Sequence, residues 1–302
     1  MLRRIVFIAI LLLFVQTSTA AFAHVENEKT LYDDIETSRA LEDIVYLRGM
    51  GLIAAEPGAK LFRPLAPLQK ADLAYWAGTF KGFGGDGKQP EQVRAEALRS
   101  GLVTSLEGDA TYADVNRAYL DGREAADQSD AKLTREQFAT YLRSAVQQPA
   151  AAGSLVQRLG YVQGPSGTIE RVIENIVGEG AAAYASYTIV VGGKEYKLSE
   201  HPKALYGPTD LKQWQGKTLS ETWMAGEASG RPEMIILKLE QGQFSREAMA
   251  VPEGGHGHHG HDAANHSAGA LKIPYVPIVA GLAGVLLLLW FWRKSRSSKE
   301  VR

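Results

Sequence analysis

The chain contains no cysteine. Disulfide bonds, a thiol nucleophile and a thiolate metal site are therefore excluded, and buried cores must hold the fold. Histidine is scarce outside one short segment, because His201 is the only one between residues 25 and 255. The Gly-x-Ser-x-Gly motif of a strained nucleophile turn is absent as well. Because a hydrolytic triad needs a serine, a histidine and a carboxylate together, we predict that the chain is not an enzyme.

An excess of positive charge is also lacking, since 33 basic residues face 34 acidic ones and the net charge at pH 7 is −1. The two ends carry net positive charge, with Arg3 and Arg4 at the start and five basic residues from Arg293 onward. Residues 24–292 are therefore acidic, which argues against nucleic acid as a partner.

Both ends of the chain carry apolar segments. Residues 1–23 combine the charged start MLRR, an apolar run of secretory length and small residues before a cleavage point at His24, which predicts a signal peptide. Residues 273–292 read IPYVPIVAGLAGVLLLLWFW, twenty residues without a charge. A helix of that length crosses the ~30 Å hydrocarbon core of a bilayer. The alternative is a buried core helix, for which apolar runs of ~10–14 residues are typical.

The basic tail at 293–302 sets the direction of this predicted transmembrane helix. Its positive charge directly follows the apolar run, and dense positive charge beside a span marks the cytoplasmic side. We therefore predict a single-pass protein of the cell membrane, with the lipid bilayer as a partner and residues 24–272 outside the cell.

Residues 31–80 carry two helical patterns. Between about 38 and 50 the apolar residues follow a helical period, and Gly51 stands where a helix ends in a left-handed conformation. A second helix is predicted after Pro67. Its buried face follows the spacing i, i+3, i+4, i+7 and consists of Leu73, Trp76, Ala77 and Phe80.

This stretch resembles the S-layer homology repeat of bacterial surface proteins. The resemblance is carried by an opening, a first helix, a turn and a Phe-x-Pro motif, formed by Tyr32, Asp34, Ile35, Ala40, Ile44, Leu47, Gly51, Leu52, Ile53, Phe62 and Pro64. The segment from Leu68 to Leu73 stands where the family has Ile-Thr-Arg-Ala-Glu-Phe.

A degenerate second copy is predicted at 91–145. Its first helix and turn are echoed by Ala97, Leu98, Gly101, Leu102 and Val103, and its Thr-Arg motif by Leu133, Thr134 and Arg135. The segment Tyr112, Asp114 and Val115 fits another repeat opening equally well. The register between Gly108 and Lys132 therefore stays open.

The resemblance implies binding rather than catalysis. Repeats of this family usually act in threes and bind anionic, often pyruvylated, cell-wall polysaccharide, which implies a Gram-positive-type envelope. By position, the implied glycan-binding residues are Asp34, Lys70, Asp72, Thr134 and Arg135. The chain departs from the family where Lys70 replaces arginine and lacks its bidentate fork, and where Arg39 replaces a frequent tryptophan. The alternative is a helical scaffold that has lost the ligand.

After a predicted linker at 146–163, residues 164–245 change to a β pattern. Alternating apolar residues on both sides of Gly192-Gly193 predict a hairpin, with strands at 168–176, 217–224 and 233–240 around it. A short helix capped by Thr209 is predicted before the fourth strand. This order fits a small barrel of the OB type, and an SH3-like barrel or a sandwich fits nearly as well.

Residues 251–272 hold a histidine cluster separated by glycines, so the segment cannot belong to a core. The candidate metal ligands are His256, His258, His259, His261, His266 and Asp262. Imidazole favours Cu(II), Ni(II) and Zn(II), and the pattern does not choose among them. The alternative is a soluble spacer.

The predicted fold class is therefore a helical repeat region, then a small all-β domain of the OB, SH3-like or sandwich type, then one C-terminal transmembrane helix. The predicted function is non-enzymatic docking to cell-wall polymer or to another envelope protein. The alternative is an accessory protein that binds or transfers a divalent metal outside the cytoplasm.

Overall fold

The computed structural model describes residues 21–22, 25–56, 58–85, 87–120, 130–148, 154–178, 184–225, 232–245 and 248, all within the first of the two units into which the chain divides. The predicted signal peptide up to residue 20, the histidine-rich segment at 251–272, the apolar stretch at 273–292 and the basic tail lie outside these residues. Within the described ranges, no helix combines the length and apolar character needed to cross a bilayer.

Six helices form the helical part of the described chain. They are α2 (Leu41–Gly49), α3 (Lys70–Phe80), α4 (Pro90–Arg99), α5 (Tyr112–Leu120), α6 (Arg135–Gln147) and α7 (Leu155–Arg158). α2 and α4 end in turns of the same form, because Gly51 and Gly101 take left-handed φ angles of 68° and 80°. In the first turn the amide of Leu52 donates to the carbonyl of Leu47 at 2.8 Å, and the equivalent bond of the second is 3.0 Å long. The predicted helix end at Gly51 is confirmed.

The amino ends of α3, α5 and α6 meet in a closed ring of backbone hydrogen bonds. The amide of Leu68 donates to the carbonyl of Leu133 at 3.0 Å, that of Ala110 to Leu68 at 2.7 Å, and that of Leu133 to Ala110 at 3.4 Å. Each of the three residues gives one bond and receives one, so the three segments are joined in a single cycle. We call this arrangement the backbone ring.

A second cycle lies at the first residue of each helix. The amide of Lys70 donates to the carbonyl of Gly108 at 2.9 Å, that of Tyr112 to Ala131 at 3.3 Å, and that of Arg135 to Ala66 at 3.0 Å. Each acceptor lies four residues before the first residue of the next helix in the cycle. The two cycles run in opposite donor directions, but within each cycle the three residues make the same kind of bond. Lys70, Tyr112 and Arg135 therefore occupy equivalent positions of a pseudo-threefold arrangement. The equivalent segments are Gln69-Lys70-Ala71-Asp72-Leu73, Thr111-Tyr112-Ala113-Asp114-Val115 and Thr134-Arg135-Glu136-Gln137-Phe138.

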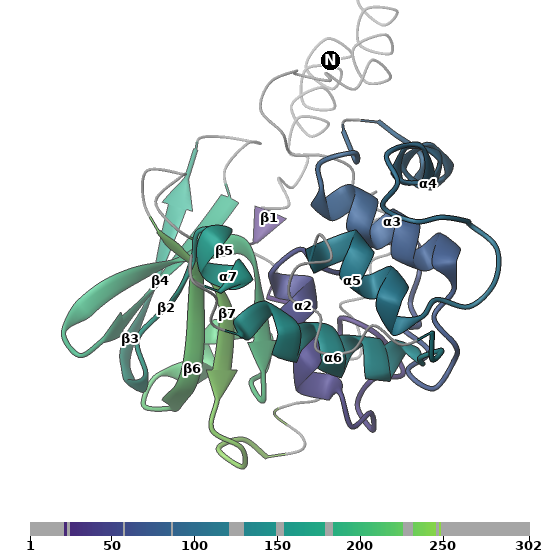
Figure 1. Cartoon of the computed structure of the whole chain (residues 1–302). Coiled ribbons are helices and arrows are strands. Elements are labelled where there is room, and N and C mark those ends of the chain that lie inside the picture. Colours follow the sequence, from purple (N-terminus) through teal and green to yellow (C-terminus); the bar gives the residue numbers. More distant parts are fainter. Residues whose placement is uncertain are drawn as a thin grey trace, which may run out of the picture. The chain divides into compact units, whose positions relative to one another are not determined.

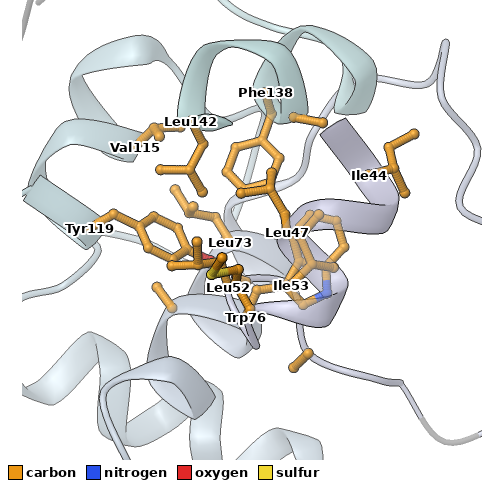
Figure 2. Close-up of a cluster of buried hydrophobic side chains, with 14 of the residues drawn as sticks. Ile44, Leu47, Leu52, Ile53, Leu73, Trp76, Val115, Tyr119, Phe138 and Leu142 are labelled. Carbon is orange, nitrogen blue, oxygen red and sulfur yellow. The ribbon is translucent and has the colours of Figure 1, made fainter. Parts of the chain in front are cut away.

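Figure 2 shows buried side chains of the helical core. Leu73, Val115 and Phe138, which hold the same position in their segments, are all completely buried. The ring of Trp76 lies against that of Phe138, with 5.5 Å between the centroids. The buried hydroxyl of Tyr119 donates to the carbonyl of Leu52 at 2.6 Å and so avoids the cost of an unpaired polar group. Burying each large apolar side chain contributes roughly 1.5–3 kcal/mol.

The strands form one mixed sheet (Figure 1). They are β1 (Ala21–Phe22), β2 (Tyr161–Gln163), β3 (Gly167–Val177), β4 (Tyr184–Val191), β5 (Lys194–Leu205), β6 (Thr218–Ala225) and β7 (Glu233–Leu239). β5 pairs with β7 and β1 with β4 in parallel, whereas the other pairs are antiparallel. Strand pairing follows a closed circuit that starts and ends at β3, through β3–β4, β4–β5, β5–β7, β7–β6 and β6–β3.

Local turn chemistry explains several strand boundaries. Gly192 and Gly193 have φ angles of 58° and 71°, so the predicted two-residue glycine turn between β4 and β5 is confirmed. The short helix before β6 is a 3₁₀ helix, η2 (Leu211–Trp214), and its cap is Asp210 rather than the predicted Thr209. The carboxylate of Asp210 accepts the amide of Lys212 at 3.0 Å.

The helices and the sheet share one core. α2 packs on α6 and also contacts β5 and β7. Leu205 of β5 and Ile236 of β7 belong to the same buried cluster as the helical core residues. The segment before α2 joins the sheet as well, because Glu26 exchanges backbone hydrogen bonds with Pro202 and Ala204 at 3.2 and 2.8 Å.

The predicted fold class is therefore wrong. The strands do not make a small, separate all-β domain of the OB, SH3-like or sandwich type that follows a helical region, because six helices and a mixed sheet pack together in the described chain. The local patterns predicted most helices and strands, but alternation along a strand reports a buried face without identifying what covers it. The predicted transmembrane helix at 273–292 lies outside the described residues.

Replacing Gly49 with alanine tests this shared core. A methyl group there would lie 2.5 Å from Cγ1 of Ile236, so the Ile236 side chain, the helix or the sheet must shift. We expect a loss of about 1–2 kcal/mol in the free energy of unfolding, since the overpacking outweighs the higher helix propensity of alanine. Urea denaturation of the purified chain measures the change.

Gly85 offers the matched control, because a methyl group there meets no atom closer than 4.0 Å. Gly85→Ala should leave the urea midpoint nearly unchanged. Equal midpoints for the two variants would contradict the close approach of α2 to the sheet.

Candidate functional site

Asp34, the first of the implied glycan-binding residues, holds a loop rather than facing an open space. Its two carboxylate oxygens accept the amides of Phe62 and Arg63 at 2.8 and 2.7 Å. Arg63 has a left-handed φ of 58°, which is unusual for a residue with a side chain. The bidentate contact from Asp34 stabilises this turn before α3.

Arg135 and Asp72 are paired with each other. An Arg135 guanidinium nitrogen lies 2.6 Å from a carboxylate oxygen of Asp72, and both side chains are mostly buried. A second guanidinium nitrogen donates to the carbonyl of Phe62 at 2.8 Å, and the group lies over the ring of Trp76. This charge is therefore neutralised inside the helical part.

Lys70 and Thr134 also make contacts within the chain. The Lys70 ammonium lies 3.5 Å from a carboxylate oxygen of Asp114, whose side chain is buried. The hydroxyl of Thr134 accepts the amide of Gln137, so it serves as the cap of α6. Lys70, Asp72, Thr134 and Arg135 therefore lie at helix starts beside the backbone ring, Asp34 contacts the loop before α3, and all five have partners in the protein.

The two ion pairs follow the threefold order of the ring. Arg135 reaches from α6 to Asp72 of α3, and Lys70 reaches from α3 to Asp114 of α5. In each case the first residue of one helix contacts the third residue of the next. At the third meeting point, the first residue of α5 is Tyr112, in the position of the cation, and the third residue of α6 is Gln137, in the position of the carboxylate. We call these three meeting points the junctions of the ring.

At the Tyr112 junction the surface has an open pocket of about 350 Å³, which we call the cavity. It is lined by Arg39, Ala40, Tyr112, Glu136, Gln137, Thr140 and Tyr141. The rings of Tyr112 and Tyr141 meet edge to face, with 4.9 Å between centroids. Two aromatic rings beside an amide, a hydroxyl and two charged groups give the mixture of apolar surface and placed polar groups that is common in ligand pockets.

Hydrogen bonds hold several walls of this cavity. The Ser38 hydroxyl donates to Glu136 at 3.1 Å, and the Thr140 hydroxyl donates to Asp43 at 2.8 Å. Tyr141 donates to Asn116 at 2.5 Å. The Arg39 side chain is different, because it is exposed and forms no salt bridge with any residue in the described ranges. Its guanidinium is therefore available to an anionic group that enters the cavity.

Groups with perturbed pKa values at the helix–sheet boundary have a structural role. Burial raises the pKa of Tyr206 to about 12, and the hydrogen bond to Glu42 adds to the rise. Burial by itself raises the pKa of Glu42, but hydrogen bonds from Lys238 and Tyr206 outweigh it and lower the pKa below its ordinary value. These three side chains join α2 to β7 and to the residue that follows β5.

No group of three or more potential metal ligands is present in the described part of the chain. The predicted ligands His256, His258, His259, His261, His266 and Asp262 all lie outside it.

Most of the cavity residues were missed by the sequence analysis. Arg39 was noted only as a departure from the repeat pattern, and Tyr112 only as an alternative repeat opening. The signal was a pattern shared by three helix starts, in which an apolar residue is followed directly by Thr or Gln and then, four positions after that, by another apolar residue. Within the stretch whose register was open, Tyr112 begins a helix equivalent to α3 and α6, whereas residues 121–129 lie outside the described part of the chain.

No family model, curated protein or solved structure matches the chain. The geometry of the ring and its cavity therefore carries the functional argument.

Asp72→Asn tests the internal role of the Arg135 pair. The variant leaves a mostly buried guanidinium without its counter-charge, and removing one partner of such a pair costs about 3 kcal/mol. We expect a clear fall in the melting temperature, measured by circular dichroism. In the control Asp109→Asn, which breaks the exposed pair with Lys132, the melting temperature should hardly move. Similar melting temperatures for both variants would disprove the structural role of Asp72.

Proposed function

We propose that the chain is a non-catalytic protein of the cell envelope that docks to an anionic cell-wall polysaccharide. The single observation that carries the proposal is the cavity at the Tyr112 junction, which has aromatic walls and an exposed guanidinium. An aromatic ring can pack on the apolar face of a sugar, while its polar neighbours bind hydroxyl groups. Arg39 can bind a carboxylate substituent of the sugar through two parallel hydrogen bonds.

The threefold ring supports the same proposal. The resemblance to S-layer homology repeats implies units that act in threes, and three equivalent helix starts form one cycle here. The implied residues Lys70, Asp72 and Arg135 serve inside the cycle, so the proposed contacts move to Arg39 and the tyrosines.

The sequence supplies the proposed location. The signal-like start, the apolar run at 273–292 and the basic tail support a single-pass protein with its large portion outside the cell membrane. This arrangement would place the cavity on the wall side of the lipid bilayer, in a Gram-positive-type envelope. A protein partner in the envelope remains the alternative occupant.

The proposal is tested with Arg39→Glu. Purified full-length chain in detergent should sediment with sacculi from the source cells, and the variant should bind at least about tenfold more weakly because one charge-assisted contact becomes repulsive. Arg99→Glu is the matched control, since it makes the same charge change at an exposed position that does not line the cavity. A wild-type chain that stays in the supernatant at moderate salt would falsify the proposal.

A second candidate function rests on the histidine cluster. Five of the seven histidines fall between His256 and His266, which is more than a spacer requires. We propose that this segment binds Cu(II), Ni(II) or Zn(II) and that it delivers the ion to a neighbouring membrane protein.

Calorimetric titration of a peptide spanning 251–272 tests the metal site. Binding in the micromolar range is expected at pH 7.5 because the metal must order a glycine-rich chain. Protons compete for imidazole near pH ~6.5, so affinity should fall steeply between pH ~7 and ~5. A peptide with asparagine at the five histidine positions is the control. Dissociation constants above ~1 mM for all three metals would exclude this function.

A further inference from the structure

The three junctions of the backbone ring are chemically unequal. Two of them contain a cation from one helix start and a carboxylate from the next, Arg135 with Asp72 at 2.6 Å and Lys70 with Asp114 at 3.5 Å. At the third, the same two positions hold Tyr112 and Gln137, so neither charge is present. The cavity of about 350 Å³ lies at this third junction.

We propose that the ring has one ligand-binding junction and that the Tyr112–Gln137 combination is the specificity determinant that keeps it open. The inference rests on the proposed function and deepens it, because it assigns a carboxylate-bearing sugar of the wall polymer to this junction alone. Arg39, at the edge of the same cavity, supplies the charge that binds the carboxylate.

The physical reason is competition between internal and external partners. At the two closed junctions each cation already contacts a mostly buried protein carboxylate, so a ligand carboxylate would have to displace that contact. Asp72 would then lose its pair with Arg135, and Asp114 would keep only the second of its ion pairs, with Arg117 at 3.6 Å. At the open junction the carboxamide of Gln137 accepts the amide of Thr134 at 2.8 Å and carries no charge. Tyr112 packs against Tyr141 and extends no cation toward Gln137. A sugar can therefore enter without breaking an ion pair.

The chain itself supplies the design that closes this junction. Tyr112→Lys combined with Gln137→Asp reproduces the Lys70–Asp114 pair at the equivalent position. The new aspartate should still cap α6, because Asp114 accepts the Thr111 amide at 3.1 Å in the equivalent place. Lys70→Arg, which retains a cation at a closed junction, is the control. A second closing variant, Thr140→Trp, fills the cavity from an exposed position on α6.

Full-length chain in detergent and sacculi from the source cells are used for all variants, and circular dichroism confirms that each one is folded. We expect both closing variants to bind sacculi at least about tenfold more weakly than wild type, and Lys70→Arg to bind like wild type. If wild type binds and either folded closing variant binds equally well, the single-junction inference is overturned while the proposed function stands. If wild type itself does not bind, the proposed function fails and this inference fails with it.

Discussion

The three backbone hydrogen bonds among Leu68, Ala110 and Leu133 are the constraint on which the helical part depends. Each segment donates to one neighbour and accepts from the other, so no two of them complete the arrangement without the third. In the second cycle the amides of Lys70, Tyr112 and Arg135, at the starts of α3, α5 and α6, gain the partners that the first turn of a helix otherwise lacks. Because the cycle supplies a partner to each, it fixes the relative positions of three segments that are far apart in the sequence.

A second constraint acts where α2 meets the sheet. Gly49 permits an approach that any side chain would prevent, and Ile236 occupies the space that this leaves. Two ion pairs also connect the helices to the sheet, Lys238 with Glu42 at 2.6 Å and Arg143 with Glu221 at 3.2 Å. Without disulfide bonds, this packing is what keeps the helices and the sheet in one unit.

Local sequence patterns predicted the features that depend on neighbouring residues, such as helix ends, buried helix faces and tight turns. The helix end at Gly51, the buried face of α3 and the Gly192-Gly193 turn depend on short-range rules, and all three are observed. The shared core was not predictable, because an apolar side chain on α2 or β7 reads the same whatever packs against it. The repeat pattern pointed to Lys70 and Arg135 as ligand contacts, but it carried no information on whether Asp114 and Asp72 already neutralise them.

The cavity exists because the chain departs from its own symmetry. If all three helix starts carried a cation and all three third positions a carboxylate, every junction would be filled by an internal pair. The ring would then be a framework with no opening at these points. Tyr112 and Gln137 replace both members of one pair at once, which avoids the cost of leaving a single buried charge. The chain has one ion pair fewer at this junction, and an aromatic-lined space lies there beside the exposed guanidinium of Arg39. In the proposed function, the two closed junctions contribute stability and the third binds the ligand.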